Sequence, residues 1–418
     1  MRNRIFILLF MIGQGVAFNL IGLITLSEIF LFIYFLVIIF NKKLFETFKN
    51  YPVLKKITWL YLGLLTVQIL SEIVISNTFN SALKGIAITV VSYLYFIFLF
   101  MFFIKDRQCI IYAFIGTLLC LLIFGSKLGM EGQGTVQEAL SGENAKYLKF
   151  YLVQFITIPL FIISAFTTKK RRIAIAIVFV GLMLVVLGAR SSGGTFALSG
   201  MISYFILIRN TINQKKIITT LLVVAVAGYG LYVVYVNQVL EGKIIAGNSE
   251  QILLLKNPYN PINLLFAGRT EAVVGWQAFM DKPLFGHGSW AVDKTGKYIF
   301  LLAKLKKLSN GDAHDDFGII PSHSVLIGSG VNNGIFAFLF IFAILFFFIK
   351  TGFKAINKKD PYISIVIFYI FSLLWVGLFS ATPAFKNTMP LAFAFLLASH
   401  IINNSKKQEK IINEKHAT

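Results

Sequence analysis

Two arginines and a histidine are the residues of this sequence best suited to chemistry. Arg190 stands alone in VVLGARSSGG (residues 185–194), where an apolar run gives way to small residues that leave the backbone open to a ligand. A lone arginine in such a place either binds an anion or reaches from the apolar region to lipid headgroups. The residues themselves leave both interpretations open.

The second arginine, Arg269, precedes a predicted helix in AGRTEAVVGWQAFMDKPLFGHGSW (residues 267–290). Thr270 is the expected N-cap, Glu271 lies in the first turn, and Pro283 ends the helix. One face of this helix is apolar and is formed by Ala272, Val273, Trp276, Phe279 and Met280. A cation beside the free N–H groups of a helix start suits a phosphate. The alternative is a pair between Arg269 and Glu271 or another acid.

The histidine, His323, follows Pro321 in PSHSVLIGSGVNNGIFAFLF (residues 321–340), at the start of an apolar segment that Ser322 is expected to cap. The ordinary pKa of a histidine is close to neutrality, so His323 can act as a general base; the alternative is a capping or packed histidine. His287, between two glycines in LFGHGSW, is either a ligand-binding or a turn residue, and the glycines favour the turn.

Two acids, Glu28 and Glu72, fall inside apolar segments, where a carboxylate is costly and often functional. They are candidates to position an acceptor molecule or to pair with Lys84. Equally, they are helix-end acids that reach water. A cluster further along, in SNGDAHDDFG, matches the spacing of no standard metal site, so we expect a structural loop without metal from Asp312, His314, Asp315 and Asp316.

Composition indicates what must position these residues. The chain of 418 residues is 57% hydrophobic and 14% charged, against about 25% charged residues in soluble domains. It therefore belongs to the membrane class, and its net charge of +21 does not imply a nucleic-acid partner.

The basic, apolar N-terminus lacks a small-residue cleavage site, so we interpret it as a retained helix and not as a signal peptide. Cys109 and Cys120 lie about 16 Å apart on one helix, too far for a disulfide.

Twelve apolar runs are long enough to cross a bilayer. They lie at about 5–21, 24–41, 57–77, 84–104, 108–126, 150–168, 173–189, 192–208, 217–236, 324–349, 361–379 and 388–402. With both termini on the inside, the short inner segments hold 24 of the 39 Lys and Arg and the short outer segments hold six. The remaining nine lie in one long outer loop. Arg190, Arg269 and His323 are then all on the outer side.

The predicted organisation is one membrane domain over residues 1–418. Nine spans occupy 1–236, the large loop 237–322, three spans 323–402, and a basic inner tail 403–418. Within the loop, KYIFLLAKLKKL (residues 297–308) predicts a basic amphipathic helix suited to an anionic membrane surface. The alternative is the solvated face of a folded loop. The expected fold class is thus an all-α polytopic membrane protein whose loop carries short amphipathic helices.

The segments LGARSSGG, AGRTEAVVGWQAFMDKPLFGHGSW and PSHSVLIGSGVNNGIFAFLF, in this order and on one side of the predicted membrane, resemble the O-antigen ligase and O-antigen polymerase superfamily. That family combines an arginine followed by small residues, a loop with an arginine, a tryptophan and PLFGHG-like sequence, and a histidine before a glycine-containing helix. The shared region covers about residues 185–345. GHGSW and IPSHS look more like the polymerase branch, whereas ARSSG replaces the commoner SRG order.

The resemblance implies an enzyme of the bacterial inner membrane with cytoplasmic termini. It would transfer a glycan from an undecaprenyl diphosphate carrier at the periplasmic face. The expected architecture is like that of C-type glycosyltransferases, without metal or cofactor. Arg190 and Arg269 match the arginines implicated in diphosphate binding, and His323 matches the proposed base. His287, Glu28 and Glu72 remain candidates for acceptor binding or positioning, and a chain-length regulator protein is an expected partner beside the lipid bilayer.

Three functions are compatible with these residues. A polymerase uses a carrier-linked repeat unit as acceptor, whereas a ligase uses lipid A-core. A polysaccharide flippase or transporter is the rival of another class, but it predicts related halves and polar residues near the middle of the membrane, and neither is clear in the sequence. We expect the polymerase.

Overall fold

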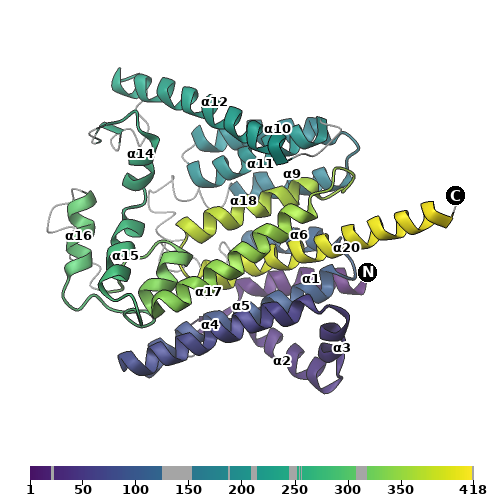
Figure 1. The fold of residues 1–418 in the computed structure, drawn as a ribbon, viewed down its shortest axis with the longest axis horizontal. Coiled ribbons are helices and arrows are strands. Elements are labelled where there is room, and N and C mark those ends of the chain that lie inside the picture. Colours follow the sequence, from purple (N-terminus) through teal and green to yellow (C-terminus); the bar gives the residue numbers. More distant parts are fainter. Residues whose placement is uncertain are drawn as a thin grey trace.

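The computed structural model describes residues 1–19, 23–124, 153–186, 189–208, 214–243, 252–253, 255, 257–306 and 318–416, and these residues are predominantly helical (Figure 1). The N-terminal half contains α1 (Arg2–Ile12), the 3-10 turn η1 (Gly13–Gly15), the strands β1 (Ala17–Asn19) and β2 (Leu23–Thr25), α2 (Leu26–Phe40), α3 (Lys43–Asn50), α4 (Val53–Ile75), α5 (Phe79–Phe103), α6 (Cys109–Phe124), α9 (Val153–Phe166) and α10 (Lys170–Val186). The C-terminal half contains α11 (Arg190–Ile208), α12 (Gln214–Leu240), α14 (Pro261–Ala267), α15 (Thr270–Asp281), α16 (Lys297–Lys306), α17 (Val325–Ala355), α18 (Ile363–Phe379), α19 (Ala384–Asn387) and α20 (Met389–His416).

Several of these helices have the length and composition of membrane spans. Within the described residues, five are long and apolar enough to cross a bilayer, at Val53–Ile75, Phe79–Phe103, Ser191–Ile208, Val325–Ala355 and Ala384–Gln408. Shorter apolar helices cover Leu26–Phe40, Cys109–Phe124, Val153–Phe166 and Ile363–Phe379. The chain is therefore a predominantly helical protein of membrane type, as its composition predicted.

The N-terminal segment differs from the two closely joined spans that we expected. Helix α1 ends at Ile12, where two glycines lower helix propensity, and β1 pairs with β2 as an antiparallel hairpin. Helix α2 then begins at Thr25, whose side chain accepts a hydrogen bond from the Glu28 backbone N–H while the Glu28 carboxylate accepts one from the Thr25 N–H. This capping box begins α2. The fold is thus helical with one small hairpin, which agrees with the predicted helical fold class.

The core lies where α5, α17, α18 and α20 meet. The second half of α5 is apolar all round and buried on every side, as expected for a helix surrounded by others. Aromatic rings fill this core; Phe348 of α17 stacks on Phe393 of α20 with ring centroids 4.1 Å apart, and Phe96 of α5 meets Phe348 edge-on. Side chains of this size hold the long helices at fixed positions.

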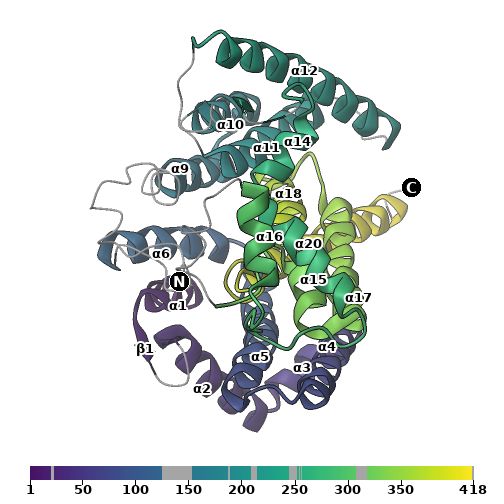
Figure 2. The same ribbon diagram turned by 90° about the vertical axis from the view of Figure 1, so that its left-hand side faces the viewer.

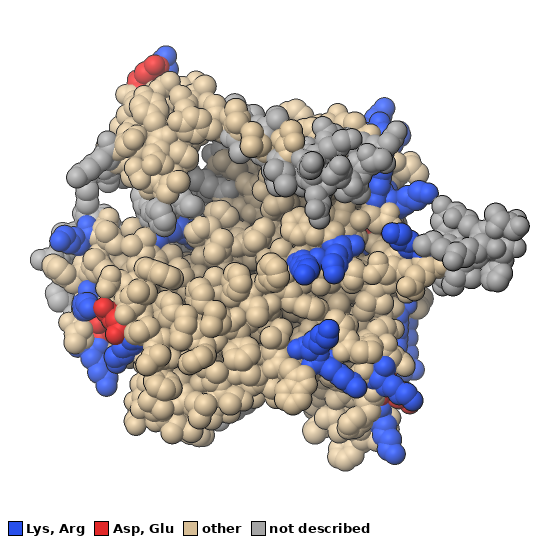
Figure 3. Space-filling view, viewed as in Figure 1, with Lys and Arg blue, Asp and Glu red and all other residues tan. Residues whose placement is uncertain are grey.

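The two ends of the helix bundle differ in charge and in covering. Lys and Arg side chains gather over the end that carries both termini, and a broad band of the same face lacks charge (Figure 3). At that end, Asp360 is fully buried and accepts hydrogen bonds from Arg107 at 2.8 Å and Asn403 at 2.9 Å. The opposite end is covered by α14, α15 and α16, which Figure 2 shows in front of α17, α18 and α20.

A break in α17 joins the helix to the covering segment. Gly334 has φ +78° within the helix, and the preceding carbonyls of Val331 and Asn332 accept hydrogen bonds from the backbone N–H groups of His287 and Gly288. Ile335 N–H donates to Pro283 O at 2.7 Å. A turn from the large loop therefore docks on α17 through main-chain hydrogen bonds.

Gly334→Ala is expected to destabilise the protein, because alanine rarely adopts a positive φ and its Cβ would overlap the Leu284 carbonyl. The backbone strain alone amounts to about 1–3 kcal/mol. The measurement is the thermal unfolding midpoint of the purified protein in detergent. Gly228→Ala in α12 is the matched control, since no described atom lies within 4 Å of the added Cβ. An unchanged midpoint for Gly334→Ala would contradict the docking.

Candidate functional site

Arg269 lies at the start of α15, as the sequence predicted, but Thr270 is not the cap. Arg269 itself occupies the N-cap position, and Thr270 is the first helical residue, so the threonine is one position too far along to cap the helix. The Arg269 guanidinium lies 5.7 Å from the centre of the Trp375 ring of α18. Burial lowers the pKa of Arg269 and the charge of Glu271 raises it, and an arginine stays protonated at neutral pH. The site thus holds a half-buried positive charge against an aromatic ring.

His323 lies half-buried in the short extended segment that precedes α17. The helix cap is Ser324 and not Ser322, because the Ser324 side chain accepts a hydrogen bond from the Ile327 N–H at 3.1 Å. The Ser324 hydroxyl also donates to the Gly377 carbonyl of α18 at 3.1 Å. His323 is therefore held beside the end of α18 by its neighbour.

The same segment packs closely against α15. Gly275 lies in the middle of α15, and a Cβ placed there would be 3.1 Å from the Pro321 carbonyl and 3.1 Å from Ser322 Cα. A Cβ at this position would require the neighbouring chain to move by a few tenths of an ångström, so the glycine allows the close approach. The residues flanking His323 and the helix that starts at Arg269 are thus in direct contact.

Arg190 is the first residue of α11, and its side chain lies outside what the structure describes. The helix runs antiparallel to α18. Ile206, near the end of α11, clusters with Ile363 at the start of α18, and Phe196 meets Phe368 with centroids 6.3 Å apart. Arg190 lies six residues before Phe196, which is about 9 Å along α11. Because the two helices are antiparallel, its backbone lies beside the second half of α18. The predicted residues Arg190, Arg269 and His323 all map to this end of α18.

His287 lies in the turn that its flanking glycines predicted. Gly286 and Gly288 have positive φ angles, and the His287 Nε2 lies 2.8 Å from the Ala278 carbonyl and 3.4 Å from the Tyr298 hydroxyl. A carbonyl only accepts, so Nε2 carries the proton. Burial lowers the pKa of His287, which keeps the ring neutral at neutral pH. His287 thus ties the docked turn to α15.

Glu72 of α4 holds the same turn from the other side. Its carboxylate accepts hydrogen bonds from the Ser289 N–H at 2.8 Å, from Asn77 Nδ2 at 2.7 Å and from Asn333 Nδ2 at 3.2 Å. The suggested pair with Lys84 is not found among the described residues, where the Glu72 carboxylate meets these three donors instead. Glu72 joins three segments that are distant in the sequence.

Glu28 likewise does not pair with Lys84. Its Oε1 lies 2.6 Å from Lys386 Nζ, and its other oxygen completes the capping box of α2. The motif Thr25-x-x-Glu28 was a readable signal of this local role. The partner Lys386 was not, since it lies in the segment that connects α18 to α20.

The amphipathic helix α16 is described from Lys297 to Lys306 and packs on α15. Tyr298 and the partly buried Leu301 and Leu302 join the apolar cluster of α15, while Leu305 stays exposed. Tyr298 OH donates to Asp281 at 2.8 Å. One face of α16 is therefore used for folding the loop. Asp312, His314, Asp315 and Asp316 lie outside the described residues.

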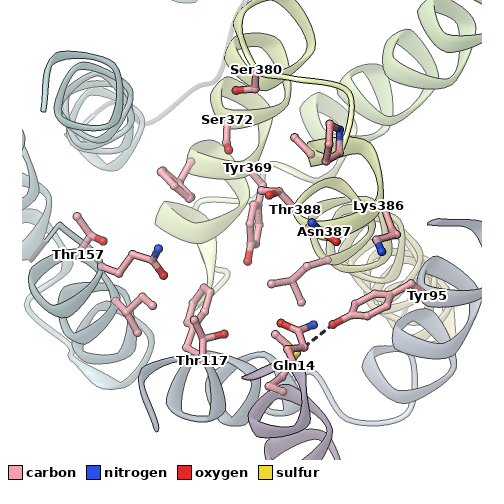
Figure 4. A pocket seen from close by; sticks show the side chains of 18 of the residues that line it. Gln14, Tyr95, Thr117, Thr157, Tyr369, Ser372, Ser380, Lys386, Asn387 and Thr388 are labelled. Carbon is pink, nitrogen blue, oxygen red and sulfur yellow. Dashed lines mark hydrogen bonds between the residues drawn. The ribbon is translucent and has the colours of Figure 1, made fainter. Parts of the chain in front are cut away.

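A cavity that the sequence did not reveal lies beside α18, and polar side chains are set in its mostly apolar lining. It has a volume of about 420 Å³ and is lined by parts of α1, η1, α2, α5, α6, α9 and α18 and by residues 380–391, which follow α18 (Figure 4). Its polar residues come from segments that lie far apart in the sequence, and most of them stand among apolar neighbours. No local sequence motif indicates these cavity residues.

Metal ligands do not gather in the described part of the chain, where no group of three or more His, Cys, Asp or Glu is close enough to hold an ion. Comparison with known proteins returned no matching family model and no matching curated protein. The functional argument therefore depends on the residues and their geometry.

Proposed function

We propose that the chain is a polysaccharide polymerase of the O-antigen polymerase type. It would transfer a glycan from an undecaprenyl diphosphate carrier to a carrier-linked repeat unit at the periplasmic face of the bacterial inner membrane. The single observation that carries the proposal is the convergence of Arg269 and His323 on one end of α18. The Arg269 guanidinium lies over the ring of Trp375 in α18. Ser324, next to His323, donates a hydrogen bond to the carbonyl of Gly377, two residues after Trp375 in the same helix.

The chemistry that suits this arrangement is a displacement at the anomeric carbon of the donor sugar. The acceptor hydroxyl forms the new C–O bond, its proton passes to His323, and the bond to the diphosphate breaks. The electron pair of that bond leaves with the undecaprenyl diphosphate. Arg269, together with Arg190, would stabilise the negative charge that develops on this leaving group, because a fixed cation in a partly dry site needs no reorganisation.

The distribution of charge supports the proposed orientation. Lys and Arg gather at the end of the bundle that carries the termini (Figure 3), and cytoplasmic loops of membrane proteins are enriched in these residues. This supports cytoplasmic termini. The end covered by α14, α15 and α16, with Arg269 and His323, would then face the periplasm, where a lipid-linked glycan is presented.

The decisive experiment is reconstitution of the purified protein in lipid with a carrier-linked repeat unit and separation of the products by length on a gel. We expect a ladder of glycans with the wild-type protein and loss of the ladder with His323→Ala. Transfer to added lipid A-core without a ladder would identify a ligase instead. Movement of the substrate across sealed vesicles without any new glycosidic bond would identify a transporter.

A further inference from the structure

The cavity beside α18 is built for a small polar ligand. Its volume of about 420 Å³ falls within the range of about 300–1,000 Å³ that is usual for small-molecule pockets. Neutral polar side chains point into it from several walls (Figure 4), and they include Gln14, Thr117, Thr157, Ser372, Ser380, Asn387 and Thr388. Hydroxyl and amide groups both donate and accept hydrogen bonds, so they match a ligand rich in hydroxyl groups.

The charge of the cavity favours an uncharged ligand. Of the residues that line it, Lys386 is the cation and Glu28 the acid, and the two are paired at 2.6 Å. The Glu28 carboxylate therefore balances the positive charge of Lys386, so this charge is not free to bind a phosphate. Aromatic rings complete the walls, namely Tyr95, Phe114, Phe161, Phe368 and Tyr369. A neutral polar lining with flat apolar surfaces suits a sugar.

One buried polar atom of the cavity lining lacks a hydrogen-bond partner among the described residues. The Tyr369 side chain is 5% exposed, and its hydroxyl has no hydrogen-bond partner among the described residues. It points toward the middle of the cavity (Figure 4). Buried hydroxyl groups almost always have a partner, so one that lacks it calls for an explanation. A ligand hydroxyl in the cavity supplies that partner.

The cavity also lies next to the proposed reaction site. Tyr369 and Ser372 line it, and Trp375, which contacts Arg269, is one turn further along the same helix. On the following segment, Pro383 lines the cavity, while the neighbouring Thr382 faces the start of α17, its Oγ1 lying 2.6 Å from where a Cβ on Gly328 would be. Residues 382 and 383 thus join the wall of the cavity to the start of α17, the helix that His323 precedes.

We propose that this cavity is a carbohydrate-binding site that holds a terminal sugar of the acceptor glycan, with the Tyr369 hydroxyl as a direct contact. The identification of that sugar as the acceptor depends on the proposed function. The existence of a sugar site does not, since it follows from the lining, the paired charges and the unpartnered hydroxyl.

The test compares two variants that each delete one buried, unpartnered hydroxyl. Tyr369→Phe removes the hydroxyl in the cavity. Ser399→Ala removes one on α20, which is fully buried and also lacks a partner among the described residues, about 12 Å further along the helix from the cavity residue Leu391. Neither deletion breaks a described hydrogen bond, so both proteins should unfold at the wild-type temperature.

Binding is measured by saturation-transfer NMR on the full chain in lipid nanodiscs. The probe is the repeat-unit oligosaccharide of the source cell, released from its carrier so that it has neither phosphate nor lipid. We expect Tyr369→Phe to weaken binding about five-fold, which is the effect of one hydrogen bond, and Ser399→Ala to bind as the wild type does. Ser372→Leu, which places an apolar side chain in the cavity, should abolish binding.

Absence of binding to the wild-type protein, or equal binding by wild type, Tyr369→Phe and Ser372→Leu, would overturn the proposed site. Polymerisation kinetics separate this failure from failure of the proposed function. A product ladder with an unchanged acceptor KM in Tyr369→Phe rejects the cavity and keeps the polymerase. Binding that depends on Tyr369 without any ladder keeps the sugar site and rejects the polymerase.

Discussion

Arg269→Ala is expected to abolish long glycan products while the protein accumulates at its normal level. The guanidinium is half-buried and lies against Trp375, so its charge acts in surroundings that screen it less than water does. Removing one fixed electrostatic contact of this kind typically lowers a rate by about 10²–10³-fold. In the reconstituted assay, a loss of this size leaves only the unextended repeat unit.

Two further variants make the interpretation specific. Arg269→Lys keeps the charge but lacks the planar group that stacks on a ring and binds two phosphate oxygens at once, so we expect partial activity. Lys304→Ala removes an exposed cation of α16 in the same loop and should leave chain length unchanged. Products of wild-type length from Arg269→Ala would remove the phosphate site from the proposal. A strong loss in Lys304→Ala would point to general attraction by a basic loop.

The sequence predicted those parts of the site that depend on local signals. Pro283 predicted the end of α15, and the glycines around His287 predicted the turn in which this histidine lies. The motif Thr25-x-x-Glu28 also indicated the start of a helix. Because apolar residues lie on both sides of the motif, we instead assigned it to a membrane-spanning segment. Local hydrogen bonds within three or four residues were readable because the chain itself brings the partners together.

The parts that could not be predicted depend on contacts between distant segments. Glu72 meets Ser289 and Asn333, which are 217 and 261 residues away. Lys386 meets Glu28 across the bundle, and the cavity takes its lining from segments that lie far apart in the sequence. The insertion of a loop backbone at Gly334 likewise depends on the packing of α4 and α17. Side-chain periodicity determines which face of a helix is buried and not which neighbour covers it.

Glu72→Ala is expected to have the largest effect on stability of any single substitution near the site. The side chain is 6% exposed, and its carboxylate accepts hydrogen bonds from the Ser289 N–H and from the amides of Asn77 and Asn333. Hydrogen bonds to a charged group contribute about 1.5–3 kcal/mol each and are not additive. We therefore expect a loss of about 3–5 kcal/mol in the free energy of unfolding, because the three donors lose their shared acceptor.

The consequence for function separates the structural role that the contacts of Glu72 indicate from the acceptor-positioning role that the sequence suggested. If the carboxylate holds the turn, Glu72→Ala should lower the unfolding midpoint, expose residues 283–296 to protease, and reduce product length together with these changes. Asn333→Ala should reproduce the pattern more weakly, and Glu46→Ala, which removes an exposed acid of α3, should have no effect. If Glu72 instead binds the acceptor directly, Glu72→Gln should raise the acceptor KM at an unchanged unfolding midpoint. The contacts with Ser289 and Asn333 favour the first result, since they leave the carboxylate facing the turn whose backbone enters the break in α17.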